Sequence, residues 1–423
     1  MANNLRPEER DVLIVGGGAA GCGAAMALQQ AGVSYLVLEQ RSDVGGAATQ
    51  AMVGTICGAM LRSASETPQW VLRDRLRSFC ERVMERSSTG PEHATDGLWY
   101  LPYRIDALQR IAREVLSGAD DSLRTGAFVS ACETHGNGIG VAQVRGEKGQ
   151  WCIAPKAVVD CTGNGHVSTL CGADVIREPE YQAPTRIMFL DGVKAERTEG
   201  LEFVIQRAMI RAAGAGWEAD EPIGHVGMVH GSHRQASLGV KVTLKHRVSG
   251  DEDFQALNAQ GRRAALYVLK VLRHWTEVFK EATVREMAPA TGVRTEQRPV
   301  GKHILTEGEV LNAAKPADGV AVGAWPIEHW GDGPGADMQW FPEGEHYLIP
   351  AGALTSVSID GLYFAGRGIS ATEMAVASAR VMGTCLGTGY AAGMLAAYRA
   401  LGWSGTEAIE KLRKEQLPIP WHA

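Results

Sequence analysis

The sequence predicts an α/β fold. A parallel sheet with flanking helices and a β-hairpin or meander insertion is joined to a smaller α+β domain with a mixed sheet. Three features of the chain indicate this arrangement. A buried strand, a glycine-rich turn, a helix and a second strand occupy 11–39. A hairpin pattern and a further strand occupy 139–160. A polar-rich region at 183–350 contains a long amphipathic helix at about 253–281.

The composition indicates the class of protein. The chain has 423 residues, enough for about two or three domains and a sizeable core. Its hydrophobic fraction of 45% and charged fraction of 21% are ordinary for a soluble globular protein. The net charge of −6 comes from interspersed charges of both signs, without the basic patch that a nucleic-acid surface needs. We therefore expect no nucleic-acid partner.

The N-terminal residues and the cysteines favour a cytoplasmic location. Residues 1–10 are polar and lack the apolar core of a signal peptide, and no apolar run is long enough to span a membrane. The eight cysteines are scattered without a C-x-x-C motif, so neither a metal site nor a disulfide framework is predicted. Such cysteine usage is typical of a reducing compartment.

The first strand, turn and helix have the spacing of a dinucleotide-binding fingerprint, the opening of a Rossmann-like domain. Gly16, Gly18 and Gly21 form the pattern G-x-G-x-x-G, and Glu39 ends the next strand. Gly16 allows the turn, Gly18 lets the backbone approach a pyrophosphate, and Gly21 lets the helix pack closely on the strand. The helix N-terminus favours phosphates. Glu39 favours a ribose 2′-hydroxyl over a 2′-phosphate.

The later elements follow in order. Gly45-Gly46 comes soon after the acid that ends the second strand, and such a pair indicates a segment lying against a cofactor or else a plain turn. The pattern then predicts helices at 70–86 and 104–116, a strand at 124–132, a hairpin of 139–144 with 151–153, a strand at 157–160, a short strand and glycine turn at 361–367, and a last helix at about 379–401.

Five blocks of sequence resemble the FAD-dependent oxidoreductase family with a glutathione-reductase-type FAD-binding domain, and they follow the family's order along the whole chain. They are the fingerprint through Thr49, V-D-C-T-G-N-G-H at 159–166, T-G-V-R-T-E-Q-R at 291–298 with Gly301, Y-L-I-P at 347–350, and A-G-R-G-I-S-A-T at 365–372 with 378–382, Cys385 and 391–393. The resemblance implies bound FAD and a redox reaction.

Two blocks depart from the family pattern near the expected active site. The family reads G-V-R-E-S-R-R where this chain has G-V-R-T-E-Q-R, and it has an aspartate where this chain has Glu328, within P-I-E-H. The local chemistry of this chain therefore has to be read from its own residues.

The resemblance also implies a domain division and a set of cofactor-binding residues. The FAD-binding domain is expected at 1–65, 104–182 and 351–423, and a substrate or cap domain at 66–103 and 183–350. The expected FAD-binding residues are Gly16, Gly18, Ala19, Ala20, Gly21, Glu39, Gln40, Arg41, Gly45, Gly46, Ala47, Thr49, Val129, Cys161, Thr162, Gly163, Gly366, Arg367, Met382 and Gly383.

The last helix is rich in glycine. Gly383 and Gly387 are spaced by four residues, as are Gly389 and Gly393, so each pair lies on one helix face. Such a face lets the helix approach a flat ligand or another helix closely. By resemblance, the N-terminal end of this region meets the pyrimidine edge of the flavin, where the helix dipole would stabilise negative charge.

Candidate substrate-contacting residues gather in an aromatic stretch at 325–347. This composition indicates the lid or wall of a pocket for a flat or apolar substrate, or else a satellite core or subunit contact. His329 and His346 are candidate catalytic bases, because the pKa range of histidine suits proton transfer, although either could be purely structural.

Three further residues complete the candidate catalytic set. Arg294 and Arg298 could each hold a substrate carboxylate bidentately, or each could pair with an acid such as Glu296 or Glu309. Cys57 could face the flavin as a reactive or covalently attached thiol, or it could be a buried, inert cysteine.

Two flavoenzyme subclasses do not fit the sequence. Disulfide reductases need a C-x-x-x-x-C pair soon after the fingerprint, and Cys57 has no such partner. A dedicated NADPH domain needs a second fingerprint, and the glycines at 136–140 do not open a helix. We therefore predict a dehydrogenase or oxidase that transfers hydride from a small organic substrate to flavin N5 at the domain interface, with oxygen or another acceptor. The alternatives are a flavin monooxygenase, a double-bond reductase or a non-catalytic FAD-binding protein.

Overall fold

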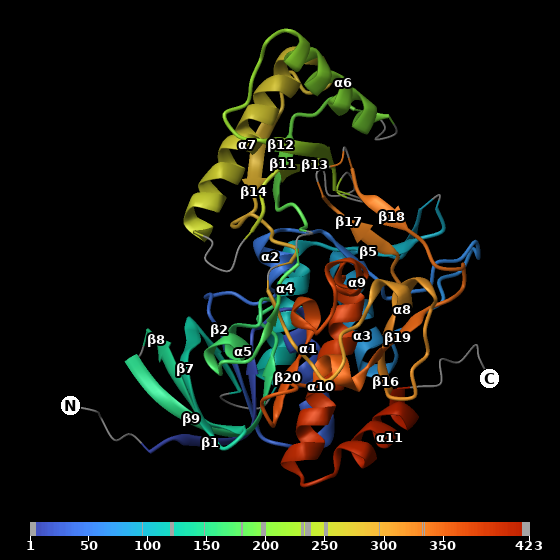
Figure 1. Ribbon diagram of the computed structural model, residues 1–423. Helices are drawn as coiled ribbons and strands as arrows, with labels where there is room; N and C mark the ends of the chain where they lie inside the picture. The colour runs from blue at the N-terminus through green and yellow to red at the C-terminus, as the bar shows by residue number, and fades with distance from the viewer. Residues whose placement is uncertain are drawn as a thin grey trace.

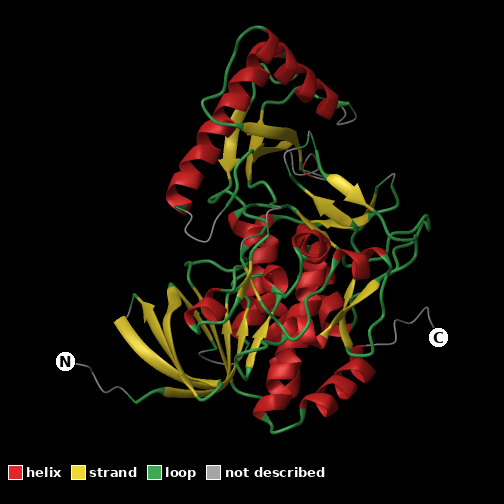
Figure 2. Cartoon of the chain, in the orientation of Figure 1, coloured by secondary structure: helices red, strands yellow, loops and turns green. Residues whose placement is uncertain are grey.

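The computed structural model describes residues 6–94, 96–118, 122–147, 149–178, 181–195, 200–229, 232, 238–248, 253–295, 297–331, 333 and 335–416. A large sheet with a group of helices beside it forms the lower part of the molecule, and a smaller sheet with two long helices stands above it (Figures 1 and 2). In Figure 1, α6 and α7 lie at the opposite end of the molecule from α11.

A seven-stranded sheet forms the centre of the lower part. Its order is β6-β2-β1-β9-β8-β7, and β20 also pairs with β9. β6, β2, β1, β9 and β20 pair in parallel, whereas β7 and β8 extend the sheet by antiparallel pairing. The predicted parallel sheet with a hairpin insertion is thus confirmed. The strands are β1 Glu8–Val15, β2 Tyr35–Glu39, β6 Leu123–Thr125, β7 Ala127–His135, β8 Gly138–Gly146, β9 Gly149–Asp160 and β20 Leu362–Phe364.

Two predicted strand boundaries were wrong. The predicted strand at 124–132 is two strands, β6 and β7, because Gly126 between them has φ +65° and breaks the extended backbone. Conversely, the strands predicted at 151–153 and 157–160 are one strand, β9. Pro155 pairs with Arg10 of β1. On the other edge of β9 it falls between the last β8 pairing at Ile153 and the first β20 pairing at Val158, so it interrupts neither of those two ladders.

The smaller sheet is antiparallel in its described pairings, not mixed as expected. Its order is β12-β13-β11-β14. Helical connections join strands of the same direction, but in each case another strand lies between the two: β13 separates β11 from β12, and β11 separates β13 from β14. The elements are β11 Thr185–Asp191, α6 Leu201–Gly214, β12 Ile223–Met228, β13 Leu238–Leu244, α7 Phe254–Trp275 and β14 Thr283–Met287.

The remaining elements are short strands and helices around the large sheet. β3, β5 and β4 form one small sheet, and β10–β15, β16–β19 and β17–β18 form three two-stranded ladders. The strands are β3 Thr55–Cys57, β4 Glu92–His93, β5 Trp99–Pro102, β10 Val175–Ile176, β15 Arg298–Pro299, β16 Gly319–Gly323, β17 Ile327–His329, β18 Asp337–Gln339 and β19 Tyr347–Pro350. The helices are α1 Ala19–Ala31, α2 Ala47–Gln50, α3 Asp74–Ser87, α4 Ile105–Ser117, α5 His166–Leu170, α8 Glu307–Leu311, α9 Glu373–Ala379, α10 Met382–Ala400 and α11 Gly405–Gln416, with 3-10 turns at Ala351–Leu354 and Gly366–Gly368.

Two helix ends differ from the prediction for local reasons. α7 ends six residues early, because Thr276 is extended and its hydroxyl donates to the carbonyl of Leu272 at 2.8 Å. The last predicted helix starts three residues late, at Met382, because Val381 is extended and separates α9 from α10. Within the described ranges, none of the helices combines the length and the apolar character that a membrane span needs.

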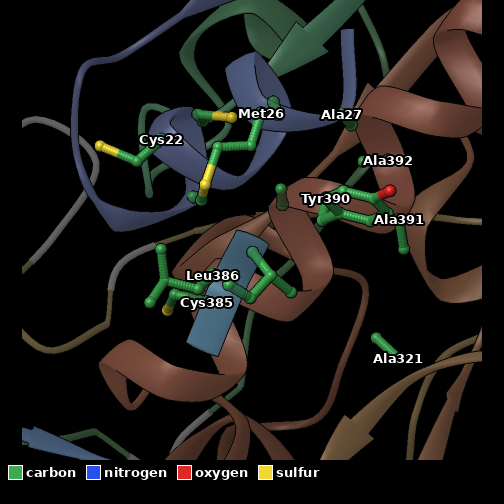
Figure 3. Packing of buried hydrophobic residues seen from close by; sticks show 14 of the residues in the cluster. Cys22, Met26, Ala27, Ala321, Cys385, Leu386, Tyr390, Ala391 and Ala392 are labelled. Atoms are coloured by element: carbon green, nitrogen blue, oxygen red, sulfur yellow. The ribbon is translucent and has the colours of Figure 1, made fainter. Parts of the chain in front are cut away.

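The glycine face of α10 packs against α1. A Cβ added at Gly389 would lie 2.0 Å from the carbonyl oxygen of Ala20, and one added at Gly393 would lie 2.8 Å from that of Ala24. Figure 3 shows Leu386 and Tyr390 of α10 beside α1. Gly389 and Gly393 therefore serve helix packing, one of the two roles expected for this face. This contact fixes α10 against the N-terminal end of α1.

Candidate active site

The turn from β1 into α1 contains the three glycines of the fingerprint. Protein packing requires glycine at two of these positions and not at the third. Gly16 has φ +109°, and an added Cβ would lie 2.6 Å from the carbonyl oxygen of Cys161. At Gly21 the clash would be with the carbonyl of Gly16, at 2.1 Å. At Gly18 the nearest protein atom would be the Cα of Gly46, 3.7 Å away. The protein itself would accept a side chain at Gly18, so the need for glycine there points to a ligand.

A second glycine segment faces this turn. The N–H of Gly45 donates to the carbonyl of Gly17 at 2.8 Å. A Cβ at Gly46 would lie 3.0 Å from the Cα of Gly18. Thr49 fixes the segment by donating its hydroxyl to Val44 at 2.9 Å, whereas Ala47 is exposed. The two backbones meet where α1 begins at Ala19 without a side-chain cap, so the first N–H groups of the helix keep no intrahelical partner.

Glu39 is held beside the turn by the backbone. It is 9% exposed, and its carboxylate accepts from the N–H of Gly17 at 2.7 Å and from that of Arg41 at 2.9 Å. Each carboxylate oxygen retains a further lone pair, so the group could also accept from a ligand hydroxyl. Gln40 and Arg41 follow at the exposed rim.

Asp160 organises the loop after β9. One oxygen accepts from the N–H and the hydroxyl of Thr162, at 3.1 and 2.6 Å, and the other accepts from the N–H groups of Val167 and Ser168. His166 then reaches the carbonyl of Val129 at 2.8 Å. Sequence reasoning placed Asp160 at a strand end but missed its role and that of His166. An acid at the end of a buried strand, directly before a glycine turn, was the available signal.

The returning chain joins the same region. The N–H of Gly366 donates to the hydroxyl of Thr388 at 3.1 Å, and a Cβ at Gly366 would lie 3.0 Å from that of Ala20. Arg367 packs on Gly163, where a Cβ would lie 2.7 Å from the guanidinium, and donates to the carbonyl of Val293. The structure therefore brings together fingerprint, middle and C-terminal residues that lie far apart in the sequence.

The start of α10 also meets the fingerprint. Met382 lines a small apolar cavity of about 10 Å³ together with Ala19, Cys22 and Gly45. A Cβ at Gly383 would lie 2.5 Å from the backbone of Gly58. An uncapped helix start, two facing glycine loops and a fixed carboxylate fit the pyrophosphate and ribose of a dinucleotide such as FAD. FAD would thus be held by Gly18, the Gly45-Gly46 segment and Glu39.

A carboxylate clamped between two indoles lies at β17. Glu328 accepts from the indole N–H of Trp325 at 2.9 Å and from that of Trp330 at 2.7 Å. Burial raises the pKa of Glu328, but the charges of Arg380 and Lys241 and the two indole hydrogen bonds outweigh it and leave that pKa below its usual range. Glu328 is therefore a fixed anion.

Cations surround this carboxylate. The ammonium of Lys241, from β13, lies 4.9 Å from the centre of the Trp330 ring, and the guanidinium of Arg294 lies 4.9 Å from the same centre. Arg380 donates to the backbone carbonyl of Glu328 at 2.8 Å. We call Lys241, Arg294, Glu328, Trp330 and Arg380 the charged cluster. Sequence reasoning missed Lys241, although a lysine inside the apolar strand β13 was a signal.

Arg294 and Lys241 both carry charge that is costly to bury. Burial, together with the nearby charge of Arg380, lowers the pKa of Arg294 to about 9. Burial also lowers the pKa of Lys241, although Glu328 partly offsets this effect. Arg294 hydrogen-bonds to neutral oxygens, namely the carbonyl of Ala183 and the hydroxyl of Thr185.

Arg298 has a different environment from Arg294. It is 1% exposed and pairs with Glu178 and Glu373 at 2.7 Å each, while its Nε donates to the carbonyl of Ala371 at 2.7 Å. An ion pair was one of the two roles considered for Arg298, but the partners are not those named from the sequence. Glu309 instead contacts His303 at 2.8 Å, and Glu296 lies outside the described residues.

The two candidate histidines lie in different places. His329 follows Glu328 on β17, and its buried Nε2 has no hydrogen-bond partner among the described residues. His346 is 3% exposed and precedes β19, and its carbonyl accepts from Lys315. His346 takes no part in the contacts described above for the charged cluster.

Cys57, at the end of β3, adjoins the charged cluster. Burial raises the pKa of its thiol to about 12, and the charge of Glu328 adds to the shift. It packs with Met338 against a small apolar group formed by Leu98, Trp325 and Val381. The thiol is therefore protonated at neutral pH, which favours the inert role over the reactive one.

Comparisons with known proteins give the family of the chain. A local match, 42% identical over 64 residues, links 15% of this chain to 13% of the soluble pyridine nucleotide transhydrogenase of Photobacterium profundum. The match thus spans only a small part of that relative's length. The flavin-dependent brominase Bmp2 has 12% identity and a TM-score of 0.50, covering 96% of this chain and 83% of that one.

Two further solved structures are similar to this chain at low identity. RebC, soaked with K252c, has 14% identity and a TM-score of 0.50, covering 97% of this chain and 65% of its own. A geranylgeranyl bacteriochlorophyll reductase-like protein from Thermoplasma acidophilum has 12% identity and a TM-score of 0.49, covering 97% and 83%. The model of the family described as FAD dependent oxidoreductase matches residues 11–413. The chain therefore belongs to the FAD dependent oxidoreductase family, and FAD is its cofactor.

Proposed function

We propose that this oxidoreductase is a dehydrogenase or oxidase that takes hydride from a small organic substrate bound between the smaller sheet and the start of α10. The observation that carries the proposal is the position of the charged cluster. It adjoins Cys57, and Arg380 lies two residues before the start of α10 at Met382. Met382 in turn contacts the cavity beside the fingerprint. Bound FAD supplies the hydride acceptor, and the protein supplies orientation and charge.

The residues of this chain would divide the remaining work. His329 would take the substrate proton at Nε2, because this buried nitrogen lacks a hydrogen-bond partner among the described residues. Glu328 would keep the cations in place, since its oxygens are held by two indoles. The N-terminus of α10 has no side-chain cap, and its dipole would favour negative charge nearby. The proposed substrate region comprises 66–103 and 183–350.

Anaerobic mixing with candidate substrates tests this proposal. FAD-loaded protein is mixed with alcohols, amines, amino acids and hydroxy acids, and the flavin absorbance is followed. Bleaching by one substrate class is expected, with recovery on adding oxygen for an oxidase or an artificial acceptor for a dehydrogenase. His329→Ala is expected to slow bleaching about 100-fold or more without loss of flavin, because a positioned base contributes about 10²–10⁴-fold. Bleaching by NADH alone, with product formed only when oxygen is present, would favour the monooxygenase alternative.

A further inference from the structure

The charged cluster carries more positive charge than its own carboxylate can balance. Three cations, Lys241, Arg294 and Arg380, surround Glu328. Two other acids are near the cluster: Glu202 lies 3.6 Å from His225 with half of its side chain exposed, and Glu373, near Arg380, is paired with Arg298 at 2.7 Å. Because charge is costly to bury without a counter-ion, an anion is the expected complement of this arrangement.

Lys241 is the clearest sign of a missing anion. It is partly buried in a strand whose other residues are buried, and its ammonium lies over the Trp330 ring. It forms no hydrogen bond or ion pair with any residue that the structure describes. An ammonium has three donors, and taking it out of water without an acceptor is unfavourable.

Arg294 presents a second donor group beside the same indole ring, that of Trp330. Its described hydrogen bonds, to Ala183 and Thr185, use one guanidinium nitrogen and two neutral oxygens. A guanidinium has five N–H groups in a planar fork that matches a carboxylate. Arg298, four residues later, is by contrast neutralised by two glutamates. The two arginines considered from the sequence therefore have opposite roles, and Arg294 keeps donors for a ligand.

Glu328 does not serve as that ligand in the structure. Trp325 and Trp330 fix its two oxygens at β17, and none of its described hydrogen bonds or ion pairs is with Lys241 or Arg294. Apolar residues also adjoin the cluster, where Cys57 and Met338 pack against Val381 and neighbouring residues. Cations and apolar groups thus lie close together here, a combination that suits an anion with an apolar body.

We propose that Lys241 and Arg294 bind the carboxylate of a small organic acid, and that the substrates of this enzyme are such acids. The proposal rests on the proposed function for the identity of the bound molecule as substrate. Binding of the carboxylate itself is independent of turnover, so the two can fail separately. Lys241 and Arg294 are on this account the residues that select an acid over its neutral analogue.

Calorimetric titration with non-reacting ligands tests the proposal. FAD-loaded protein is titrated with acetate, benzoate and phenylacetate, and with the corresponding amides, which have nearly the same shape but no charge. At least one acid is expected to bind about 10-fold or more tightly than its amide, because hydrogen bonds to charged groups are worth about one to two powers of ten each. Equal affinity for each acid and its amide, or no binding of any acid, would overturn the proposal.

Variants locate the site. Lys241→Met is expected to weaken binding of the acid about 10-fold to 100-fold and to leave the amide unchanged, and Lys241→Arg is expected to restore most of the loss. Lys245→Met removes the same charge from an exposed position just beyond β13 and is expected to have no effect. Flavin content and thermal midpoint verify that each variant is folded. If folded Lys241→Met and Arg294→Met both bind the acid as tightly as the wild type, the assignment is wrong.

Discussion

Replacing Arg298 by methionine tests whether this arginine stabilises the fold or binds the substrate. Arg298 is buried and contributes hydrogen bonds to Glu178, Glu373 and Ala371, each at 2.7 Å. Methionine fills much of the space but leaves two acids without their cation. Glu373, whose side chain is 5% exposed, keeps donors from Gln182 and Thr295, at 3.1 and 2.6 Å.

The magnitude follows from these contacts. Removing one partner of a buried ion pair costs about 3–5 kcal/mol. The lower end applies here, because Glu178 is 25% exposed and Glu373 keeps two donors. About 3 kcal/mol is a large share of the stability of a typical protein, which is about 5–15 kcal/mol. The unfolding equilibrium constant should therefore rise about a hundredfold.

Urea unfolding followed by tryptophan fluorescence measures this effect, with thermal unfolding as a second readout. Arg294→Met is the matched control: it removes the same group from two neutral hydrogen-bond acceptors and should cost only about 1 kcal/mol. Adding Glu373→Gln to Arg298→Met should recover part of the loss, because the unpaired charge is removed. An Arg298→Met protein as stable as the wild type, with full flavin content, would refute the structural role.

Three further predictions concern the cofactor site and the helices beside it. Gly18→Val should abolish FAD binding yet leave the unfolding temperature of the flavin-free protein unchanged, because the nearest protein atom to a new Cβ is 3.7 Å away; a fully loaded yellow variant would contradict this. Gly389→Ala should destabilise the protein by about 1–3 kcal/mol, because the new Cβ would lie 2.0 Å from the carbonyl oxygen of Ala20. Gly387→Ala is the control and should be neutral or stabilising, because its Cβ would have no atom nearer than 4.0 Å. Equal urea midpoints for the two variants would exclude the close contact at Gly389. With a pKa of about 12, only about 10⁻⁴ of Cys57 is thiolate at pH 8, and this fraction grows as the pH rises. Iodoacetamide should therefore label Cys57 slowly at pH 8, as measured by peptide mass spectrometry, and rapid labelling at that pH would show an activated thiol.

The proposed FAD-binding turn between β1 and α1 could be predicted because the residues that form it are close together in the sequence. A strand, three glycines and a helix lie within twenty-four residues, and Glu39 follows on the neighbouring strand. The packing clashes at Gly16 and Gly21 and the free space at Gly18 agree with the roles that the spacing indicated. A motif of this kind can be recognised in a sequence because each of its residue types meets one requirement of the backbone.

The charged cluster could not be predicted because its members come from distant segments. Lys241, Arg294, Glu328 and Arg380 lie on β13, after β14, on β17 and after α9, and no spacing rule connects them. The partners of Arg298 lie 120 and 75 positions away along the chain. Side-chain identity alone suggested that both arginines could bind a carboxylate, and only tertiary contacts distinguish them.

The smaller sheet shows a second limit of sequence patterns. Strand and helix signals were present, but strand order is set by long-range pairing. β13 inserts between β11 and β12, so the sheet is antiparallel although α6 and α7 connect its strands. Strand ends had the same difficulty on a smaller scale, as at Pro155, where one continuous strand contains a residue that usually interrupts strands.

The visible spectrum of the purified protein, before and after acid precipitation, tests the central claim most directly. We expect a yellow protein with about one flavin per chain. We also expect the colour to pass into the supernatant, because the Cys57 thiol is protonated and the proposed FAD contacts are backbone groups and Glu39, which form no covalent bond. Colour that stays in the pellet would contradict non-covalent binding. A colourless protein that cannot be reconstituted with FAD would contradict the cofactor site itself.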